Sequence, residues 1–249
     1  MNDWIIPDWP APGNVKALFT TRNGGVSGGM NRAYASLNLG SHVNDNLVDV
    51  ERNRALLRRY LPEEPKWLKQ VHGTHPVWID GTPATLEGDA AWSRRQGAVC
   101  AVMVADCLPV FLCDQNGVAV GIAHAGWRGL VGGVIEQTIA AMQVDGRQLM
   151  AWLGPAIGPN HFEVGADVRD AFVSHDLQSA CAFVARESHH EEKWLADIFL
   201  LARQRLIAAG VTEIYGGGTC TFSDPVRFFS YRRDGETGRM AALIWLETP

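Results

Sequence analysis

Hydrophobic positions along the chain form short runs of aliphatic and β-branched residues and a few stretches with helical spacing. The runs predict strands over residues 15–20, 67–71, 76–79, 99–104, 110–113, 118–123, 211–215, 226–231 and 240–246. The helical stretches are 47–61, 130–142 and 194–209, the last closed by Gly210. A glycine-rich loop over 23–29 and a turn over 115–117 complete the pattern. We therefore expect one α/β or α+β domain over residues 1–249, with the strands between 99 and 123 at a sheet centre.

Three of the predicted strand ends hold side chains that bind metals. His72 lies at the bend between strands 67–71 and 76–79, Cys107 lies in the break between 99–104 and 110–113, and His124 follows 118–123. Two imidazoles and a thiolate leave the fourth position of a zinc ion open, as in catalytic rather than structural sites. The wide spacing does not match a compact zinc-finger pattern. The alternative is a buried small Cys107 and two partly buried polar histidines.

Composition and charge exclude several functional classes. Hydrophobic residues make up 47% and charged residues 20%, which is ordinary globular usage, so neither disorder nor a membrane span is predicted. A net charge of −5 argues against nucleic-acid binding. Residues 1–7 lack the features of a secretory signal, so we expect a cytoplasmic protein. An odd set of five cysteines in that compartment predicts free or metal-bound thiols.

An anion site is predicted where the chain turns after His124. Gly126 and Gly129 lead into the predicted helix, and backbone amides in such a loop bind anions. Arg128 would strengthen that pocket. The alternative is that Arg128 is a solvated surface charge and the glycines only turn the chain.

Taken together, several uncommon motifs resemble one known family over nearly the whole chain. They are SLNLG at 36–40, Asn53-Arg54, QVHG at 70–73, ADCLP at 105–109, HAGWRG at 124–129, LGPAIGP at 153–159, FSYRRD at 229–234 and TGRM at 237–240. In this order they are similar to the YfiH family, long labelled polyphenol oxidase or laccase-domain protein and now described as purine nucleoside phosphorylase. The chain departs at 29–34, where GMNRAY replaces a more usual Gly-Pro-Tyr or Gly-Pro-Phe run.

The resemblance implies a zinc enzyme of nucleoside metabolism. His72, Cys107 and His124 would bind Zn²⁺, and the substrates would be purine nucleosides with inorganic phosphate as co-substrate. The reactions would be phosphorolysis of adenosine, inosine, guanosine and S-methyl-5′-thioadenosine, and deamination of adenosine. Arg54 corresponds to a phosphate contact. The implied fold is a layered α-β-β-α sandwich with mixed sheets, similar to bacterial toxin deamidases that use Cys and His; we expect a monomer or weak homodimer.

Roles for the remaining groups follow from the chemistry of these reactions. Arg54 and Arg128 would hold phosphate for attack on the ribose C1′. Asp106 is the nearest carboxylate in sequence to carry protons in deamination, with Glu163 a weaker alternative. Asp106 is as readily a residue that orients a metal-bound histidine or caps its loop. His75 matches no family motif and is not assigned to the metal.

Three other functions use the same residues. Cys107 could be the nucleophile of a cysteine hydrolase or deamidase, with His124 or His72 as its base. A copper-dependent polyphenol oxidase is a weaker alternative, because Cu²⁺ also suits this donor set but the chain has no His-x-His pair for a trinuclear centre. Met103 as an axial copper ligand is less typical than Met103 as core. A non-enzymatic nucleotide- or metal-binding protein would need only Arg54 and the glycine loops.

Overall fold

The computed structural model describes residues 2–28, 32–81, 86–186 and 192–247. Its strands are β1 Val15–Phe19, β2 Pro76–Trp78, β3 Ala90–Ser93, β4 Cys100–Val104, β5 Leu108–Asp114, β6 Val120–Ala125, β7 Leu149–Leu153, β8 Glu163–Gly165, β9 Phe183–Arg186, β10 Lys193–Ala196, β11 Glu213–Gly216 and β12 Met240–Leu246. Its helices are α1 Leu47–Arg58, α2 Trp127–Gly132, α3 Val134–Met142, α4 Ala166–His175, α5 Ile198–Ala208 and α6 Tyr231–Asp234. Two 3₁₀ turns, Gly146–Gln148 and Leu177–Ala182, lie between them. None of these helices is long and apolar enough to span a bilayer, a finding that covers the described ranges.

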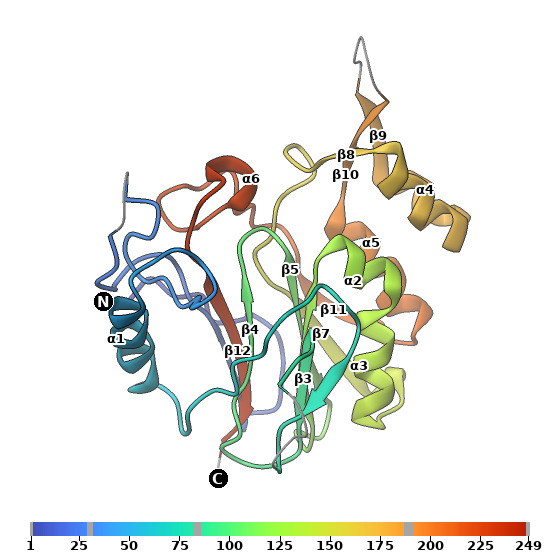
Figure 1. The fold of residues 1–249 in the computed structure, drawn as a ribbon. Helices are drawn as coiled ribbons and strands as arrows, with labels where there is room; N and C mark the ends of the chain where they lie inside the picture. The colour runs from blue at the N-terminus through green and yellow to red at the C-terminus, as the bar shows by residue number, and fades with distance from the viewer. Residues whose placement is uncertain (1, 29–31, 82–85, 187–191, 248–249) are drawn as a thin grey trace.

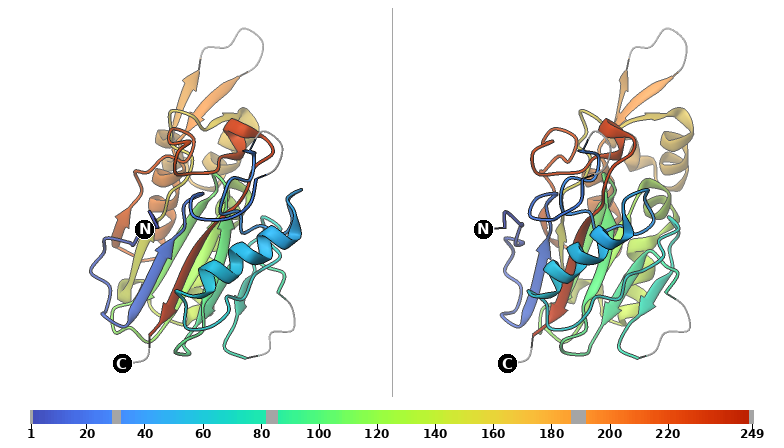
Figure 2. Two further views of the ribbon diagram at one scale, coloured as in Figure 1. Left: turned by 90° about the vertical axis from the view of Figure 1, so that its left-hand side faces the viewer. Right: turned by 60° about the vertical axis from the view of Figure 1, so that its left-hand side comes forward.

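Two stacked sheets form the centre of the molecule. The large sheet has the order β11-β7-β5-β6-β3-β2 and mixes parallel with antiparallel pairs, whereas the small sheet β1-β12-β4 is antiparallel. Helices α2, α3 and α5 lie on the outer face of the large sheet, and α1 crosses the outer face of the small one (Figures 1 and 2). A third sheet, β8-β10-β9, extends from one end of this body. The expected single-domain α-β-β-α sandwich with mixed sheets is confirmed.

Strand periodicity explains the four layers. In β12, Ala242 and Ile244 face the core between the two sheets, while Leu243 and Trp245 face the core under α1. Because alternate side chains point to opposite faces, a strand that is apolar throughout is buried on both sides. In β5 the same alternation places Phe111 in the core between the two sheets, whereas Val110 and Leu112 pack under the helices of the large sheet.

The predicted strands are confirmed for 15–20, 76–79, 99–104, 110–113, 118–123, 211–215 and 240–246, within a few residues at their ends. The turn over 115–117 is also confirmed. The expectation that 99–123 forms one sheet centre is wrong, since β4 belongs to the small sheet and β5 and β6 to the large one. Asp106, with φ of 85°, carries the chain from one sheet to the other.

Two predicted strands are not formed. At 67–71 there is only an isolated bridge at Lys69, because the Gln70 side chain itself pairs with β4: its Nε2 donates to the Met103 carbonyl over 2.9 Å, and the Met103 amide donates to its Oε1 over 2.7 Å. At 226–231 the chain winds into turns, where Asp224 accepts the amide of Arg227 and α6 begins. In both segments side chains supply the hydrogen bonds that a ladder would have made.

The predicted helices are present with changed limits. The helix at 47–61 ends at Arg58. The helix predicted over 130–142 begins earlier, at Trp127, and is divided by Gly133, whose φ of 99° breaks the helical path. The helix predicted over 194–209 begins only at Ile198, because residues 193–196 form β10 and Asp197 caps α5. Gly29 of the glycine-rich loop and residues 29–31 of the family departure lie outside the described residues.

Candidate metal centre

The register of the large sheet brings Cys107 and His124 together. Pro109 of β5 pairs with His124 of β6, and Cys107 lies two residues before Pro109, so the two side chains share the face that points toward the small sheet. His124 is inside β6, not past its end as predicted; its side chain still lies at the end of the space between the sheets. His72 comes from the loop before β2.

These three side chains form a cluster that can hold a metal ion. Their ligand atoms all lie within 4.8 Å of one another, and His72 Nε2 is 4.0 Å from Cys107 Sγ. His124 is buried, Cys107 is partly buried and His72 is exposed, so the cluster is open on one side. One thiolate and two imidazoles are the donors that zinc and copper accept, and the residues therefore fit the metal that the motifs imply.

Asp89, immediately before β3, holds two of the three ligands. Its fully buried carboxylate accepts a hydrogen bond from Nδ1 of His124 over 2.9 Å, which leaves Nε2 of that ring for a metal. The same carboxylate accepts the backbone amides of Val71, His72 and Gly73 at 3.1, 2.9 and 2.7 Å. A metal-bound histidine commonly donates its other ring nitrogen to such a carboxylate.

Electrostatics favours a thiolate beside an imidazolium. Burial disfavours ionisation of Cys107, but His124 and His72 beside it lower the pKa of its thiol. Burial likewise disfavours the charged form of His124, but Cys107 and Asp89 raise its pKa. A thiolate is the form of cysteine that binds metals and that attacks carbon, so this charge state serves either chemistry.

Backbone geometry at the cluster is unusual. His72 and Asp106 have φ values of 59° and 85°, the left-handed region that few side chains other than those of Asn, Asp and His enter. At Gly126 a Cβ atom would lie 2.9 Å from Cys107 Sγ and 3.2 Å from His72 Cδ2. The glycine therefore lets the chain pass close to the ligands, which is a stricter role than the turn predicted for it.

Asp106 attaches the short helix α6 beside the cluster. Its carboxylate accepts the hydroxyls of Thr221 and Ser230 over 2.6 and 3.0 Å, and the Arg232 amide over 2.7 Å. Among the described residues, no contact links Asp106 to His72 or His124. Of the roles predicted for Asp106, its contacts match loop capping. It is Asp89 that orients the His124 ring and the loop at His72.

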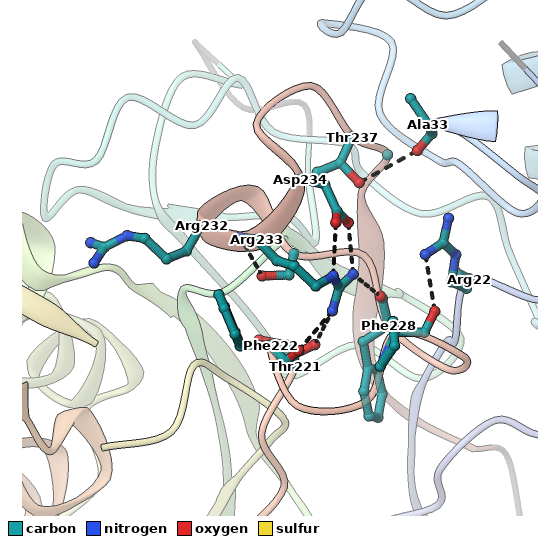
Figure 3. Close-up of polar contacts among 12 residues, drawn as sticks. Arg22, Ala33, Thr221, Phe222, Phe228, Arg232, Arg233, Asp234 and Thr237 are labelled. Atoms are coloured by element: carbon teal, nitrogen blue, oxygen red, sulfur yellow. Dashed lines mark hydrogen bonds and ion pairs between the residues drawn. The ribbon is translucent and has the colours of Figure 1, made fainter. Parts of the chain in front are cut away.

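Arg233 fixes the other side of α6 (Figure 3). Its guanidinium donates to the carbonyls of Thr221, Phe222 and Phe228 over 2.9–3.0 Å and to the Asp234 carboxylate over 2.7 Å. Arg232 points away from this network and donates to the Glu163 carbonyl over 2.6 Å. We call residues 220–239 the cap segment.

Two adjoining cavities open at the cluster and share His72, Ala105, Cys107 and Tyr231. One, of about 210 Å³, is largely apolar, with Arg128 and Arg232 at its polar part; its apolar lining is Trp127, Ile157, Phe162 and Ile198. The other, of about 420 Å³, has a larger polar share and several basic side chains; its further lining includes His42, Gln70, Met103, His124 and Arg239. We call them the apolar cavity and the basic cavity.

The remaining predicted site residues fall around these cavities. Arg128 is exposed, lines the apolar cavity and stacks 4.3 Å above the Trp127 ring. Arg54 lies behind the basic cavity: its Nε and Nη2 donate to the Leu39 carbonyl over 3.0 and 2.9 Å, and it stacks 4.4 Å above Trp67.

Several weaker candidates do not join the cluster. Glu163 forms an ion pair with Arg186 on β9. Met103 lines the basic cavity from β4 and is not one of the clustered donors, nor is His75.

The residues that sequence reasoning missed are Asp89, His42, Tyr231 and Arg239. Asp89 had one signal, an acidic residue directly before a buried strand, and Arg239 was present within a family motif without a role. Strand β3 itself had not been predicted, so nothing in the sequence placed Asp89 next to His124.

Comparisons with known proteins agree with these observations. Residues 16–247 match the family model described as multi-copper polyphenol oxidoreductase laccase. The chain is 52% identical to a purine nucleoside phosphorylase of Pseudomonas aeruginosa, over 99% of this chain and 100% of that protein. It is 50% identical to purine nucleoside phosphorylase YfiH of Escherichia coli K12, again over 99% and 100%.

Solved structures show the same fold. A crystal structure of a Neisseria meningitidis protein superposes with a TM-score of 0.90 at 51% identity, covering 99% of this chain and 100% of that one. YlmD from Geobacillus stearothermophilus gives a TM-score of 0.82 at 32% identity, covering 96% and 94%. The expected likeness to toxin deamidases stays a prediction.

Proposed function

The chain belongs to the YfiH family of purine nucleoside phosphorylases, whose family model has the laccase description, and we propose that it splits purine nucleosides with inorganic phosphate at the His72–Cys107–His124 cluster. The observation that carries this proposal is the position of the cluster between an apolar cavity and a basic one. A purine nucleoside and phosphate need such a pair of environments. The named relatives support the reaction class.

The cavities suggest how the substrates lie. The purine packs in the apolar cavity against Trp127 and Phe162, and the ribose C1′ then lies near the cluster. A phosphate oxygen forms a bond to C1′ while the bond from C1′ to the purine nitrogen breaks, and the purine leaves with a proton. Positive charge develops on the ribose in this step, so an anion placed beside it lowers the barrier.

We propose zinc as the metal held by His72, Cys107 and His124, with Cu²⁺ also able to bind. When bound, zinc supplies Lewis-acid chemistry at an open coordination position. The chain's own contribution is to hold the donors: Asp89 fixes the tautomer of His124 and the path of the chain at His72.

The same site supports a broader set of reactions. Adenosine, inosine, guanosine and S-methyl-5′-thioadenosine share the purine that the apolar cavity accepts, and we propose all four as phosphorolysis substrates. We also propose deamination of adenosine, in which water replaces the 6-amino group and ammonia leaves. Because the Asp106 oxygens already accept three hydrogen bonds from the cap segment, we assign Asp106 a positioning role in both reactions.

A cysteine hydrolase is the second candidate, and a specific observation favours it. Cys107 lies 4.0 Å from the His72 ring nitrogen and has a lowered pKa, as an activated nucleophile has. Asp89, which orients the His124 ring, would also suit such a nucleophile, but the second histidine is more than a Cys-His pair requires. Copper oxidase chemistry has weaker support, since the described residues contain a single cluster of three donors.

The test of the proposed function is a product assay. Zinc-loaded protein given inosine and phosphate should form hypoxanthine and ribose 1-phosphate, and omission of phosphate should stop the reaction. Treatment with a chelator should abolish turnover, and added Zn²⁺ should restore it. Phosphate-independent release of products, or no turnover of any purine nucleoside, would contradict the proposal.

Arg54 offers a sharper version of that assay. Arg54→Ala should reduce phosphorolysis about tenfold, through the lost charge beside the basic cavity, and should affect deamination without phosphate much less. Arg52→Ala is the matched control, since Arg52 is an exposed arginine of the same helix. Equal losses in the two reactions would withdraw the phosphate role from Arg54.

A further inference from the structure

We propose that Arg239 and His42 form an oxyanion pocket in the basic cavity and that Arg239 is the residue that directly holds the phosphate. This inference rests on the proposed function and names a subsite within it. The observations that carry it are the free donors of Arg239, the close approach of Arg239 and His42 at Gly40, and the charge of the cavity.

Arg239 is fixed by its backbone amide and by one of the three nitrogens of its guanidinium. Its amide donates to the Asn38 side chain over 2.9 Å, and its Nη1 donates to the carbonyls of Thr237 and Gly238 over 2.8 and 3.1 Å. Within the described ranges of the chain, no hydrogen bond or ion pair uses its Nε or Nη2. An arginine held at one nitrogen, with two donor nitrogens left beside a cavity that it lines, is ready for a two-point contact with an oxyanion.

Gly40 lets Arg239 and His42 pack against the same point of the backbone. A Cβ atom at Gly40 would be 2.8 Å from Cγ of Arg239 and 3.4 Å from Cε1 of His42. Both basic side chains therefore pack close to the backbone at Gly40, where a larger residue would displace them. His42 lines the cavity from the loop before α1, a segment far in sequence from Arg239.

The described residues that line the basic cavity include no carboxylate, and its one thiol, Cys107, belongs to the His72–Cys107–His124 cluster. Partial burial lowers the pKa of His42, and Arg239 and Arg54 lower it further, so these positive groups act on the same space. A bound oxyanion would neutralise that charge, and a metal ion at the cluster would add to the attraction. A dianion such as phosphate is the ligand class that this cavity favours.

Arg54 contributes to the cavity from behind. Its Nε and Nη2 already donate to the Leu39 carbonyl, and Met103 lies between it and the open space, 4.0 Å from its Nη2. Arg54 therefore acts on the phosphate mainly by its charge and by holding the loop at Leu39, whereas Arg239 makes the contact.

Direct binding of inorganic phosphate to the zinc-loaded protein tests this assignment without turnover. Isothermal titration calorimetry should give a phosphate Kd that is about tenfold to a hundredfold higher in Arg239→Gln, a smaller increase in His42→Gln and no change in Arg147→Gln. Arg147 is an exposed arginine that pairs with Asp145 and lies outside both cavities. Arg147→Gln therefore removes the same charge without changing the pocket. In steady state, Arg239→Gln should raise the KM for phosphate far more than the KM for inosine.

A second variant keeps the test decisive if Arg239→Gln does not fold, since Nη1 also supports the backbone. Arg239→Lys retains the charge and loses the two-point contact, and should show an intermediate Kd. An unchanged phosphate Kd in folded Arg239→Gln overturns the assignment. If that variant does not fold, an unchanged Kd in both Arg239→Lys and His42→Gln overturns it. A loss of phosphate binding that is confined to Arg54→Ala also overturns it. A dependence on Arg239 for binding AMP but not inorganic phosphate also overturns it, because the pocket would then serve a nucleotide. Phosphate binding that depends on Arg239, without cleavage of inosine, would contradict the proposed function but would still support the phosphate pocket.

Discussion

Two buried carboxylates flank the His72–Cys107–His124 cluster, and they are attached to different parts of the molecule. Asp89 accepts hydrogen bonds from a ligand ring and from the amides on either side of another ligand, so it belongs to the cluster. Asp106 is the neighbour of Cys107 in sequence, yet its hydrogen bonds go to the cap segment. Sequence proximity therefore misleads here: the distant residue orients the ligands and the adjacent one holds α6.

The two carboxylates therefore have separate functions. Changes at Asp89 should act on metal affinity first and on turnover as a consequence. Changes at Asp106 should act on the cap segment, which lines both cavities through Tyr231, and should leave the metal in place.

The largest effect is expected from removal of Cys107, the residue that directly follows Asp106 in the chain. Cys107→Ala should lose bound zinc and all activities together while it keeps the fold, because the sheets form without metal, unlike a zinc finger. Metal analysis, product assays and circular dichroism measure the three properties. Cys113→Ala is the control, a buried cysteine on the same face of β5 that should keep metal and activity. A Cys107→Ala protein that binds zinc normally but is inactive would favour the nucleophile role.

A smaller effect is expected at Asp89. Asp89→Asn should weaken zinc binding about 10–100-fold, because the amide cannot accept all of the hydrogen bonds from His124 and the loop at His72. Competition with a chromophoric chelator measures the affinity. Asp114→Asn is a matched control: that buried carboxylate also accepts three backbone amides, at the far end of β5, so it should lose stability but not zinc. Equal zinc affinities in the two variants would contradict a role of Asp89 in holding the zinc-binding side chains.

The smallest effect is expected at Asp106. Asp106→Asn should keep one zinc per chain and lower kcat/KM for nucleosides about threefold to tenfold, as the hydrogen bonds to the cap segment weaken. Thr221→Val removes one of the same bonds from the other side and should act in the same direction. Loss of zinc from Asp106→Asn would erase the distinction between the two carboxylates.

Much of the fold and part of the site were predictable from the sequence. Strand β12 was predicted with its observed limits, because seven consecutive apolar residues between polar ones admit few alternatives. The ligand trio was predicted from donor chemistry and position at strand ends. The absence of a strand at 67–71 could not be predicted, because the Gln70 side-chain amide replaces backbone pairing there. The role of Asp89 could not be predicted either, because its partner His124 lies on a neighbouring strand and the register of two strands is set only in the assembled sheet.

The most direct test of the central claim is the coordination shell of the metal. Zinc K-edge X-ray absorption of protein purified with one equivalent of zinc should show one sulfur at about 2.3 Å and two imidazole nitrogens at about 2.0–2.1 Å, with an additional light scatterer in the open position. A shell without sulfur, or one that is unchanged in Cys107→Ala, would contradict the convergence of His72, Cys107 and His124 on one metal ion.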